Sequence, residues 1–220
     1  MFARALQKFI KIRYFFGIGL FFSHFTLSAN IELVIQDQHG QQLQNAVVEL
    51  TPTKNQLTST NLPVAIMDQV HKQFLPELLV VQKGQRVNFP NSDNIRHNVY
   101  SFSQAKPFQL KLYSGQPKDP ITFEQQGVVV LGCNIHDSMV GYIYVANSGD
   151  VYKTDEKGYV SLPLTVLPAQ VSVWHPLQTA PLENKKIIKI NSQNQSLVTI
   201  NTSSPAPRNT FGNKFKAGND

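Results

Sequence analysis

The residue types best suited to chemistry in this chain lie together in one short stretch, residues 132–139. It places a thiol, an imidazole and a thioether, from Cys133, His136 and Met139, within seven positions of one another. A blue copper site takes one Cys sulfur and two His nitrogens in a trigonal plane, with a weak axial Met. The stretch supplies three of these four groups, and His97, between two strand-like runs, is the candidate for the fourth. The residue types and their spacing therefore predict a copper site.

Three other interpretations of Cys133 compete with copper. A lone Cys is most often a small buried hydrophobic residue. A structural zinc site would need a further Cys, His or carboxylate, and such sites seldom use Met. A Cys–His catalytic pair would need a third group to orient the imidazole, and no candidate lies at a suitable spacing. We favour copper because it uses His97, Cys133, His136 and Met139 together.

The wider segment, residues 69–145, resembles a cupredoxin, the small blue copper fold. The matching features are an Asn-rich turn before the pair His97-Asn98, a Phe-x-x-x-Gly run from Phe123 to Gly127, the spacing Cys133-x-x-His136-x-x-Met139, and Gly141 and Val145 after it. The short ligand loop is similar to that of amicyanin. The chain also resembles bacterial exported proteins labelled as methylamine-utilisation proteins, a label that says little about a substrate.

The resemblance implies a role for each residue at one type 1 copper ion. Cys133 would bind as a thiolate, because a metal displaces its proton. His97 and His136 would bind as neutral imidazoles, and Met139 at longer range would favour Cu(I) and raise the reduction potential. Asn98 would tie the His97 segment to the Cys loop and hold the ligands rigid. His97 is expected to be the more buried imidazole and His136 the electron port.

A small surface around His136 is expected to dock redox partners, because transient redox complexes use small interfaces. Ile135 and Pro90 would supply its apolar part. Asp137 stands where amicyanin-like loops commonly carry Pro, so the charge of this surface would differ from theirs. Arg96, beside the first His, is either a steering charge for an acidic partner or an ordinary solvated turn residue. The identity of the partner cannot be derived from the sequence.

Residues 1–29 have the pattern of an export signal. Four basic residues, Arg4, Lys8, Lys11 and Arg13, precede an apolar run over residues 14–27, and the pair Ser28-Ala29 ends it. The run is short for a membrane span, so a stable membrane anchor is the less favoured alternative. The pattern predicts a soluble protein of the bacterial periplasm. Without the leader, sixteen Lys and Arg face fourteen Asp and Glu, so the formal charge falls from +6 to +2, which gives nucleic-acid binding little support.

Export sharpens the argument about Cys133, which is the only Cys of the chain. An oxidising compartment favours paired thiols. A single thiol there must be buried, joined to another chain, or held by a metal. Metal ligation is the option that also accounts for His136 and Met139.

Apolar and β-branched residues recur in short runs bounded by Gly, Pro, Asn or Asp, a pattern typical of an all-β protein. The expected strands are residues 31–35, 46–50, 78–81, 87–89, 108–112, 128–131, 142–145, 159–162 and 171–174. Residues 185–190 and 197–201 predict a further hairpin. Only residues 65–74 could form a helical turn or two.

The segments that flank the cupredoxin-like part resemble the two halves of a carboxypeptidase-regulatory-like, transthyretin-like β-sandwich. Residues 30–62 would supply the first half and residues 147–201 the second, with an Asp155-x-x-Gly158 turn between two strands. We predict that a cupredoxin Greek-key sandwich, residues 63–146, is inserted at a hairpin of this small sandwich, where insertions are tolerated. Two β-domains in tandem are the alternative. Residues 202–220, rich in Ser, Pro, Asn and Lys, are expected to form a disordered tail.

The favoured function is a periplasmic carrier of single electrons between redox partners, which is not an enzyme. One alternative is a copper-binding, delivery or partner-docking protein without a redox-carrier role, and another is a scaffold in which copper is incidental. The full ligand set favours the carrier, because delivery sites usually stay open and Met-rich and this chain has three Met. His39, His71 and His175 have no ligand partners at a recognisable spacing. The sequence also lacks the His-Cys-His arrangement that joins a blue site to a trinuclear cluster.

Overall fold

The structure, a computed structural model, describes residues 30–51, 62–147, 149–163, 167–191 and 196–203. These residues form 17 strands and no helix, so the all-β prediction is confirmed. The expected leader and residues 204–220 of the expected tail lie outside the described residues. Within the described part, no helix is long and apolar enough to cross a membrane.

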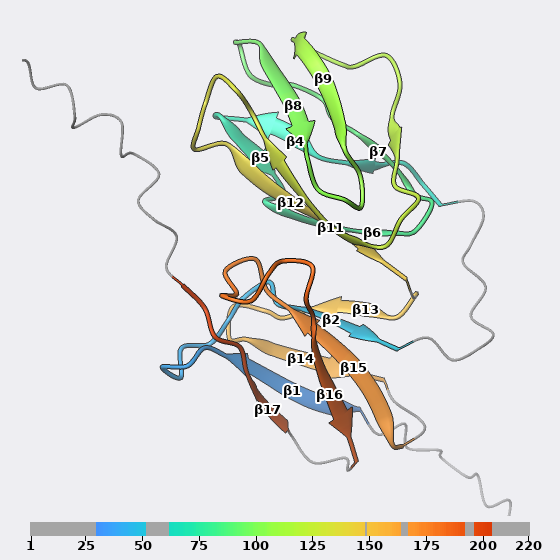
Figure 1. The fold of residues 1–220 in the computed structure, drawn as a ribbon, viewed down its shortest axis with the longest axis vertical. Coiled ribbons are helices and arrows are strands. Elements are labelled where there is room, and N and C mark those ends of the chain that lie inside the picture. Colours follow the sequence, from blue (N-terminus) through green and yellow to red (C-terminus); the bar gives the residue numbers. More distant parts are fainter. Residues whose placement is uncertain (1–29, 52–61, 148, 164–166, 192–195, 204–220) are drawn as a thin grey trace, which may run out of the picture.

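Residues 65–146 form one β-sandwich, which we call the ligand sandwich (upper half of Figure 1). Its larger sheet has the strand order β6-β12-β11-β8-β9 and its smaller sheet the order β10-β7-β3, with a separate β4–β5 hairpin. In the larger sheet β6 runs parallel to β12, and the other neighbours are antiparallel. The bounds are β3 Ala65–Ile66, β4 Asp68–Val70, β5 Gln73–Leu75, β6 Leu78–Gln82, β7 Arg86–Asn88, β8 His97–Ser101, β9 Phe108–Tyr113, β10 Ile121–Thr122, β11 Gly127–Gly132 and β12 Val140–Ala146.

The core of the ligand sandwich is apolar and includes two candidate copper ligands. Successive side chains of a strand point to opposite faces, and one face of β11 and β12 points into this core. Three aromatic rings, from Phe89, Phe108 and Phe123, pack together with centroids 5.6 to 6.5 Å apart. Cys133 and Met139 belong to the same buried cluster. The loop that carries Cys133 and Met139 is therefore anchored in a close-packed core, and such packing restricts its movement.

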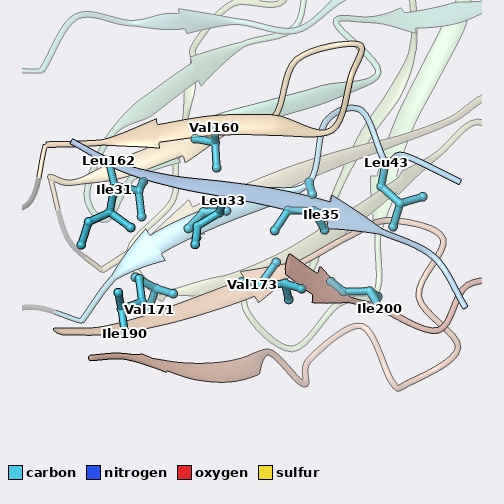
Figure 2. Packing of buried hydrophobic residues seen from close by; sticks show 13 residues of the cluster. Ile31, Leu33, Ile35, Leu43, Val160, Leu162, Val171, Val173, Ile190 and Ile200 are labelled. Carbon is cyan, nitrogen blue, oxygen red and sulfur yellow. The ribbon is translucent and has the colours of Figure 1, made fainter. Parts of the chain in front are cut away.

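The flanking residues form a second sandwich, which we call the flanking sandwich (lower half of Figure 1). Its sheets have the orders β14-β1-β17 and β13-β2-β15-β16. Alternate residues of the first strand, Ile31, Leu33 and Ile35, are fully buried and meet Val171 and Val173 of the opposite sheet, as Figure 2 shows. The bounds are β1 Ile31–Gln36, β2 Val47–Leu50, β13 Val151–Lys153, β14 Tyr159–Leu162, β15 Ala169–Trp174, β16 Lys186–Ile190 and β17 Ser196–Thr199.

The chain leaves and re-enters the flanking sandwich at neighbouring strands. β2 pairs with β13, with Glu49 opposite Val151, and the Leu50 N–H donates to the Asp150 carbonyl at 2.9 Å. The Asp155–Gly158 turn then joins β13 to β14, with Gly158 N–H donating to the Asp155 carbonyl at 3.0 Å. Strands from before and after the ligand sandwich thus share sheets.

A second apolar cluster joins the two sandwiches. The face of β12 that points away from the ligand core carries Tyr142 and Tyr144, whose rings lie 6.0 and 5.7 Å from that of Trp174 on β15. Beside them, Glu49 accepts hydrogen bonds from the Tyr144 hydroxyl at 2.7 Å and from Lys185 Nζ at 2.8 Å. β12 is therefore buried on both faces, which explains why it is almost uniformly apolar.

Two local predictions are wrong. Residues 65–74 form strand β3 and the β4–β5 hairpin instead of a helical turn. The expected hairpin of residues 185–190 and 197–201 does not form, because β16 pairs with β15 whereas β17 runs parallel to β1. At the start of the expected tail, the backbone N–H of Thr202 donates to Gln38 and that of Ser203 to the Leu177 carbonyl, at 2.8 and 2.9 Å. These two residues are therefore part of the folded structure.

Candidate metal centre

Residues 133–139 form the loop between β11 and β12, and its turns bring three candidate ligands together. The last residue of β11 pairs with the first residue of β12, so the sheet fixes both ends of the loop. The His136 N–H donates to the Cys133 carbonyl at 3.4 Å, and the Met139 N–H donates to the His136 carbonyl at 2.8 Å. The loop is thus folded back on itself, with its two sulfur-bearing residues buried in the core below.

Gly132, directly before the Cys, lets an aromatic ring of the neighbouring strand come close. The ring of Tyr100 on β8 lies over this glycine, and a Cβ at position 132 would be 2.6 Å from Tyr100 Cζ. Non-bonded carbon atoms do not approach that closely, so a larger residue at position 132 would require the Tyr100 ring to move.

A β-bulge at the start of β8 directs two consecutive side chains to the site. The pairing with β9 shifts between His97 and Val99, which leaves Asn98 unpaired. Bulges re-aim side chains that a regular strand would send to opposite faces. Both His97 and Asn98 are accordingly buried, at 0% and 5% exposure, and both contact Cys133.

Three of the predicted ligands form a compact cluster. The ligand atoms of His97, Cys133 and His136 all lie within 4.8 Å of one another. Cys133 Sγ lies 3.7 Å from His97 Nδ1, and the two imidazole rings have centroids 4.9 Å apart. Met139 is 1% exposed and packs in the same core cluster as Cys133. The structure thus brings together the residue set of a type 1 copper site.

The protonation and hydrogen bonding of His136 fit a metal ligand. Its Nδ1 atom is buried and has no hydrogen-bond partner among the described residues, which is rare for a buried polar atom. Burial lowers the pKa of His136, and the nearby His97 and Lys72 lower it further. A neutral imidazole with a buried nitrogen that makes no hydrogen bond is the form that a metal binds. The combination of one thiol, two imidazoles and one thioether fits copper better than zinc or a hard cation.

Asn98 connects the two segments that carry the ligands. Its side-chain oxygen accepts a hydrogen bond from the Asn134 N–H at 2.9 Å and lies 3.4 Å from Cys133 Sγ. One amide therefore fixes the backbone directly after the Cys and contacts its sulfur. Contacts of this kind hold metal ligands in place and tune their electron density.

Asp93, which no motif of the sequence singled out, contacts the other nitrogen of His97. Asp93 Oδ2 lies 2.7 Å from His97 Nε2, and the Asp93 side chain is 11% exposed. Burial would raise the pKa of Asp93, but hydrogen bonds from the Lys72 N–H, His97 and the His71 N–H hold it below its ordinary value. The carboxylate thus favours a proton on Nε2 and leaves Nδ1 free to face Cys133. The only available signal was its place four residues before the His, in the Asn-rich turn.

The residues predicted to dock a partner differ in their exposure. Ile135 is 51% exposed, and Arg96 and Asp137 are also exposed. Pro90 is buried, so its predicted place in an apolar surface patch is wrong. Its carbonyl instead accepts a hydrogen bond from the Gln69 side chain at 3.0 Å inside the ligand sandwich.

The other histidines that the sequence left unassigned lie away from the cluster or outside its ligand set. His175 is buried, and its Nε2 lies 3.1 Å from the Gln44 carbonyl, which is an ordinary structural contact. His39 is exposed in a turn of the flanking sandwich. His71 is exposed at the tip of the β4–β5 hairpin.

No protein-family model and no curated protein matches the chain. Among solved structures, the chain is similar to a copper-containing nitrite reductase from Thermus scotoductus SA-01, with 24% identity and a TM-score of 0.37 over 44% of this chain and 25% of that one. It is similar to a purple cupredoxin from Nitrosopumilus maritimus, with 22% identity and a TM-score of 0.33 over 37% of this chain and 99% of that one. For an oxidised amicyanin variant the identity is 16% and the TM-score 0.34, over 44% of this chain and 97% of that one. The chain thus spans only a quarter of the nitrite reductase, and its similarity to cupredoxins extends over less than half of its own length.

Proposed function

We propose that this protein binds one type 1 copper ion and carries single electrons between redox partners in the periplasm. The observation that carries the proposal is the cluster of His97, Cys133 and His136, whose ligand atoms lie within 4.8 Å, beside the buried Met139. No carboxylate belongs to the cluster among the described residues, so hard cations find no suitable donors there.

The protein would hold the candidate ligands in position before copper binds. Cys133 would bind as a thiolate and the two imidazoles in their neutral form. Asn98 fixes the backbone after the Cys, and Asp93 fixes the ring of His97. Copper would supply a one-electron couple there, and Met139 would favour its reduced state. Rigid ligands reduce the rearrangement that accompanies a change of charge, which suits a carrier better than a delivery protein.

The surface around His136 is the proposed docking site. Ile135 would form its apolar centre, since this side chain is half exposed beside a ligand. Arg96 would attract an acidic partner, while Asp137 would disfavour one on its side of the loop. A small, partly charged surface suits a transient complex that must dissociate after each electron.

The proposal also covers the organisation of the chain. Residues 1–29 would direct export and be removed, and residues 63–146 would be a cupredoxin domain inserted into the small sandwich of residues 30–62 and 147–201. The pairing of β2 with β13 supports insertion, because it brings together the strands that precede and follow the inserted segment. The apolar cluster between the sandwiches would keep them in one orientation.

The experiment is to add Cu(II) to the purified mature protein and record the visible spectrum. We expect one equivalent to produce an intense band near about 600 nm, because sulfur-to-copper charge transfer gives type 1 sites their colour. Cys133→Ala should abolish the band, and a redox titration of the wild type should give one reversible one-electron step. Colourless binding, or a band that survives in Cys133→Ala, would contradict the proposal. Coloured but irreversible copper would favour the delivery alternative.

A further inference from the structure

We propose that the β4–β5 hairpin positions His97 through Asp93 and thereby sets the reduction potential of the site. The inference rests on the proposed function, because it takes His97 as a copper ligand. It assigns a role to a hairpin that carries none of the four ligands. The hairpin belongs to the segment for which the sequence predicted a helical turn.

Asp93 joins the hairpin to the candidate ligand by three short contacts. Its Oδ1 accepts a hydrogen bond from the His71 N–H at 2.6 Å, and its Oδ2 accepts one from the Lys72 N–H at 2.9 Å. The same Oδ2 lies 2.7 Å from His97 Nε2. Each carboxylate oxygen of Asp93 therefore accepts a hydrogen bond from the backbone of one turn, and Oδ2 also contacts the imidazole.

The turn itself has an uncommon conformation that the carboxylate stabilises. Val70 pairs with Gln73, so His71 and Lys72 are the two central residues of a tight hairpin turn. Both have positive φ angles, 51° and 60°. Such turns strongly prefer Asn-Gly or Gly-Gly, and side chains larger than these carry a conformational cost. Two charge-assisted hydrogen bonds from the turn's amides offset that cost only while Asp93 remains in place.

The base of the hairpin is fixed to the segment that leads to His97. The Ser92 hydroxyl donates to Asp68 Oδ2 at 2.8 Å, and the Ser92 N–H donates to the Gln69 carbonyl at 3.0 Å. On its inner side, Phe74 packs on Gly141 of β12, where a Cβ would lie 2.8 Å from that of Phe74. The hairpin therefore has little freedom to move relative to the sheet that carries the ligand loop.

The turn also borders the ligand loop. A pocket of about 370 Å³ separates the two, lined by His71 and Lys72 on one side and by Ser138 and Val140 on the other. The hairpin can thus position His97 through Asp93 while the proposed docking side chain Ile135 stays exposed.

The chemical consequence follows from the charge of Asp93. A carboxylate that accepts the Nε2 proton fixes the tautomer and increases the electron density on Nδ1, the nitrogen that faces Cys133. A negative charge at this distance stabilises Cu(II) more than Cu(I), so Asp93 lowers the reduction potential. The two turn amides donate hydrogen bonds to the same carboxylate and so weaken its effect on the potential. The backbone of the hairpin therefore also influences the reduction potential.

The test uses the full mature protein reconstituted with Cu(II) and compares Asp93→Asn with Asp68→Asn. Asp68 is a matched control, because it is a carboxylate of the same hairpin that contacts Ser92 but no candidate ligand. We expect Asp93→Asn to keep the coloured band and to shift the one-electron equilibrium toward Cu(I) by at least tenfold, or about 59 mV. Asp68→Asn should shift it several times less. Equal shifts in the two variants would overturn the inference.

A second variant keeps the carboxylate and displaces the turn. One Gly inserted between His71 and Lys72 should remove at least one amide from Asp93, which strengthens the contact with His97 and lowers the potential, opposite to Asp93→Asn. An unchanged reduction potential in the insertion variant would overturn the role of the hairpin. This variant can be measured even if Asp93→Asn does not fold.

A metal-free measurement separates this inference from the proposed function. In the apo protein, amide hydrogen exchange at His71 and Lys72 should speed up at least tenfold in Asp93→Asn and several times less in Asp68→Asn, because Asp68 contacts only the base of the hairpin. If the wild type forms no coloured copper site, the proposed function fails, whatever the exchange result. If the wild type is coloured but Asp93→Asn leaves both potential and exchange unchanged, only the hairpin inference fails.

Discussion

The side-chain oxygen of Asn98 lies 3.4 Å from the sulfur of Cys133 and accepts a hydrogen bond from the next backbone N–H, that of Asn134, at 2.9 Å. The side-chain amide of Asn98 on β8 therefore holds the start of the ligand loop, which follows β11. Since His97 precedes Asn98 in the same bulge, the relative position of the two segments depends on this contact.

We expect Asn98→Ala to weaken copper binding by about 10- to 100-fold, the usual effect of removing a residue that orients metal ligands. The reason is that the loop loses its hydrogen bond to β8 while all four candidate ligands remain. Competition with a chelator of known affinity measures the change. Asn94→Ala is the control, because Asn94 is exposed in the turn before His97. Equal affinities of Asn98→Ala and the wild type would show that the loop holds its shape without this amide.

The sequence predicted most of the strands and singled out candidate ligands that the structure brings together, but it did not predict the contacts around them. Short apolar runs locate strands because burial imposes a period of two. The loop from Cys133 to Met139 is local, so its spacing alone suggests a metal. Asp93 was missed because its role depends on the backbone of the His71–Lys72 turn, and no Gly or Asn marks that turn. The parallel pairing of β17 with β1 was missed because the two strands are distant in the sequence.

The axial position can be tested by Met139→Gln. We expect the coloured band to remain and the reduction potential to fall, because a harder oxygen ligand favours Cu(II) over Cu(I). Spectroscopy and a redox titration on the same sample measure both quantities. Met67→Leu provides a control, since Met67 is a fully buried methionine of the same core cluster. A potential that stays the same in Met139→Gln would remove Met139 from the ligand set.

The ion pair of Glu49 and Lys185, which lies where the flanking sandwich meets Tyr144 of the ligand sandwich, should make stability depend on pH. Burial would raise the pKa of Glu49, but hydrogen bonds from Lys185, the Tyr144 hydroxyl and the Asn147 N–H hold it below its ordinary value of 4.5. A carboxyl whose pKa is lower in the folded state stabilises the fold above its unfolded pKa. This contribution is lost as the pH falls through the folded value.

Glu49→Gln should therefore reduce the free energy of unfolding at pH 7 by about 2–3 kcal/mol, because charged hydrogen bonds are lost in a buried site. The difference from the wild type should shrink as the pH falls below about 4.5. Denaturant titrations of the metal-free proteins at several pH values measure it. Glu156→Gln, at an exposed turn position, should show no such dependence. A difference between Glu49→Gln and the wild type that is the same at every pH would contradict the ionised Glu49.

The proposed insertion predicts how the chain behaves when it is divided. Glu49 on β2 lies opposite Val151 on β13, so the two strands that flank the deletion of residues 63–146 already pair with each other. A short Gly-Ser linker would then close a small loop at little entropic cost. We expect the shortened protein to be β-rich and to unfold cooperatively. The excised segment, which contains all four candidate ligands, should still bind copper.

The fluorescence of Trp174, the single tryptophan of the chain, gives a second measurement on the shortened protein. Trp174 is fully buried against Tyr142 and Tyr144 of β12, and removing the ligand sandwich takes both rings away. Its fluorescence should therefore shift to longer wavelength in the shortened protein, although the flanking sandwich remains folded. Apolar surface from Val47 and Trp174 becomes exposed at the same time, which is expected to lower solubility at high concentration. An aggregated, unfolded deletion protein beside a stable excised segment would favour two domains in tandem, since each flank would then lack strands that it needs.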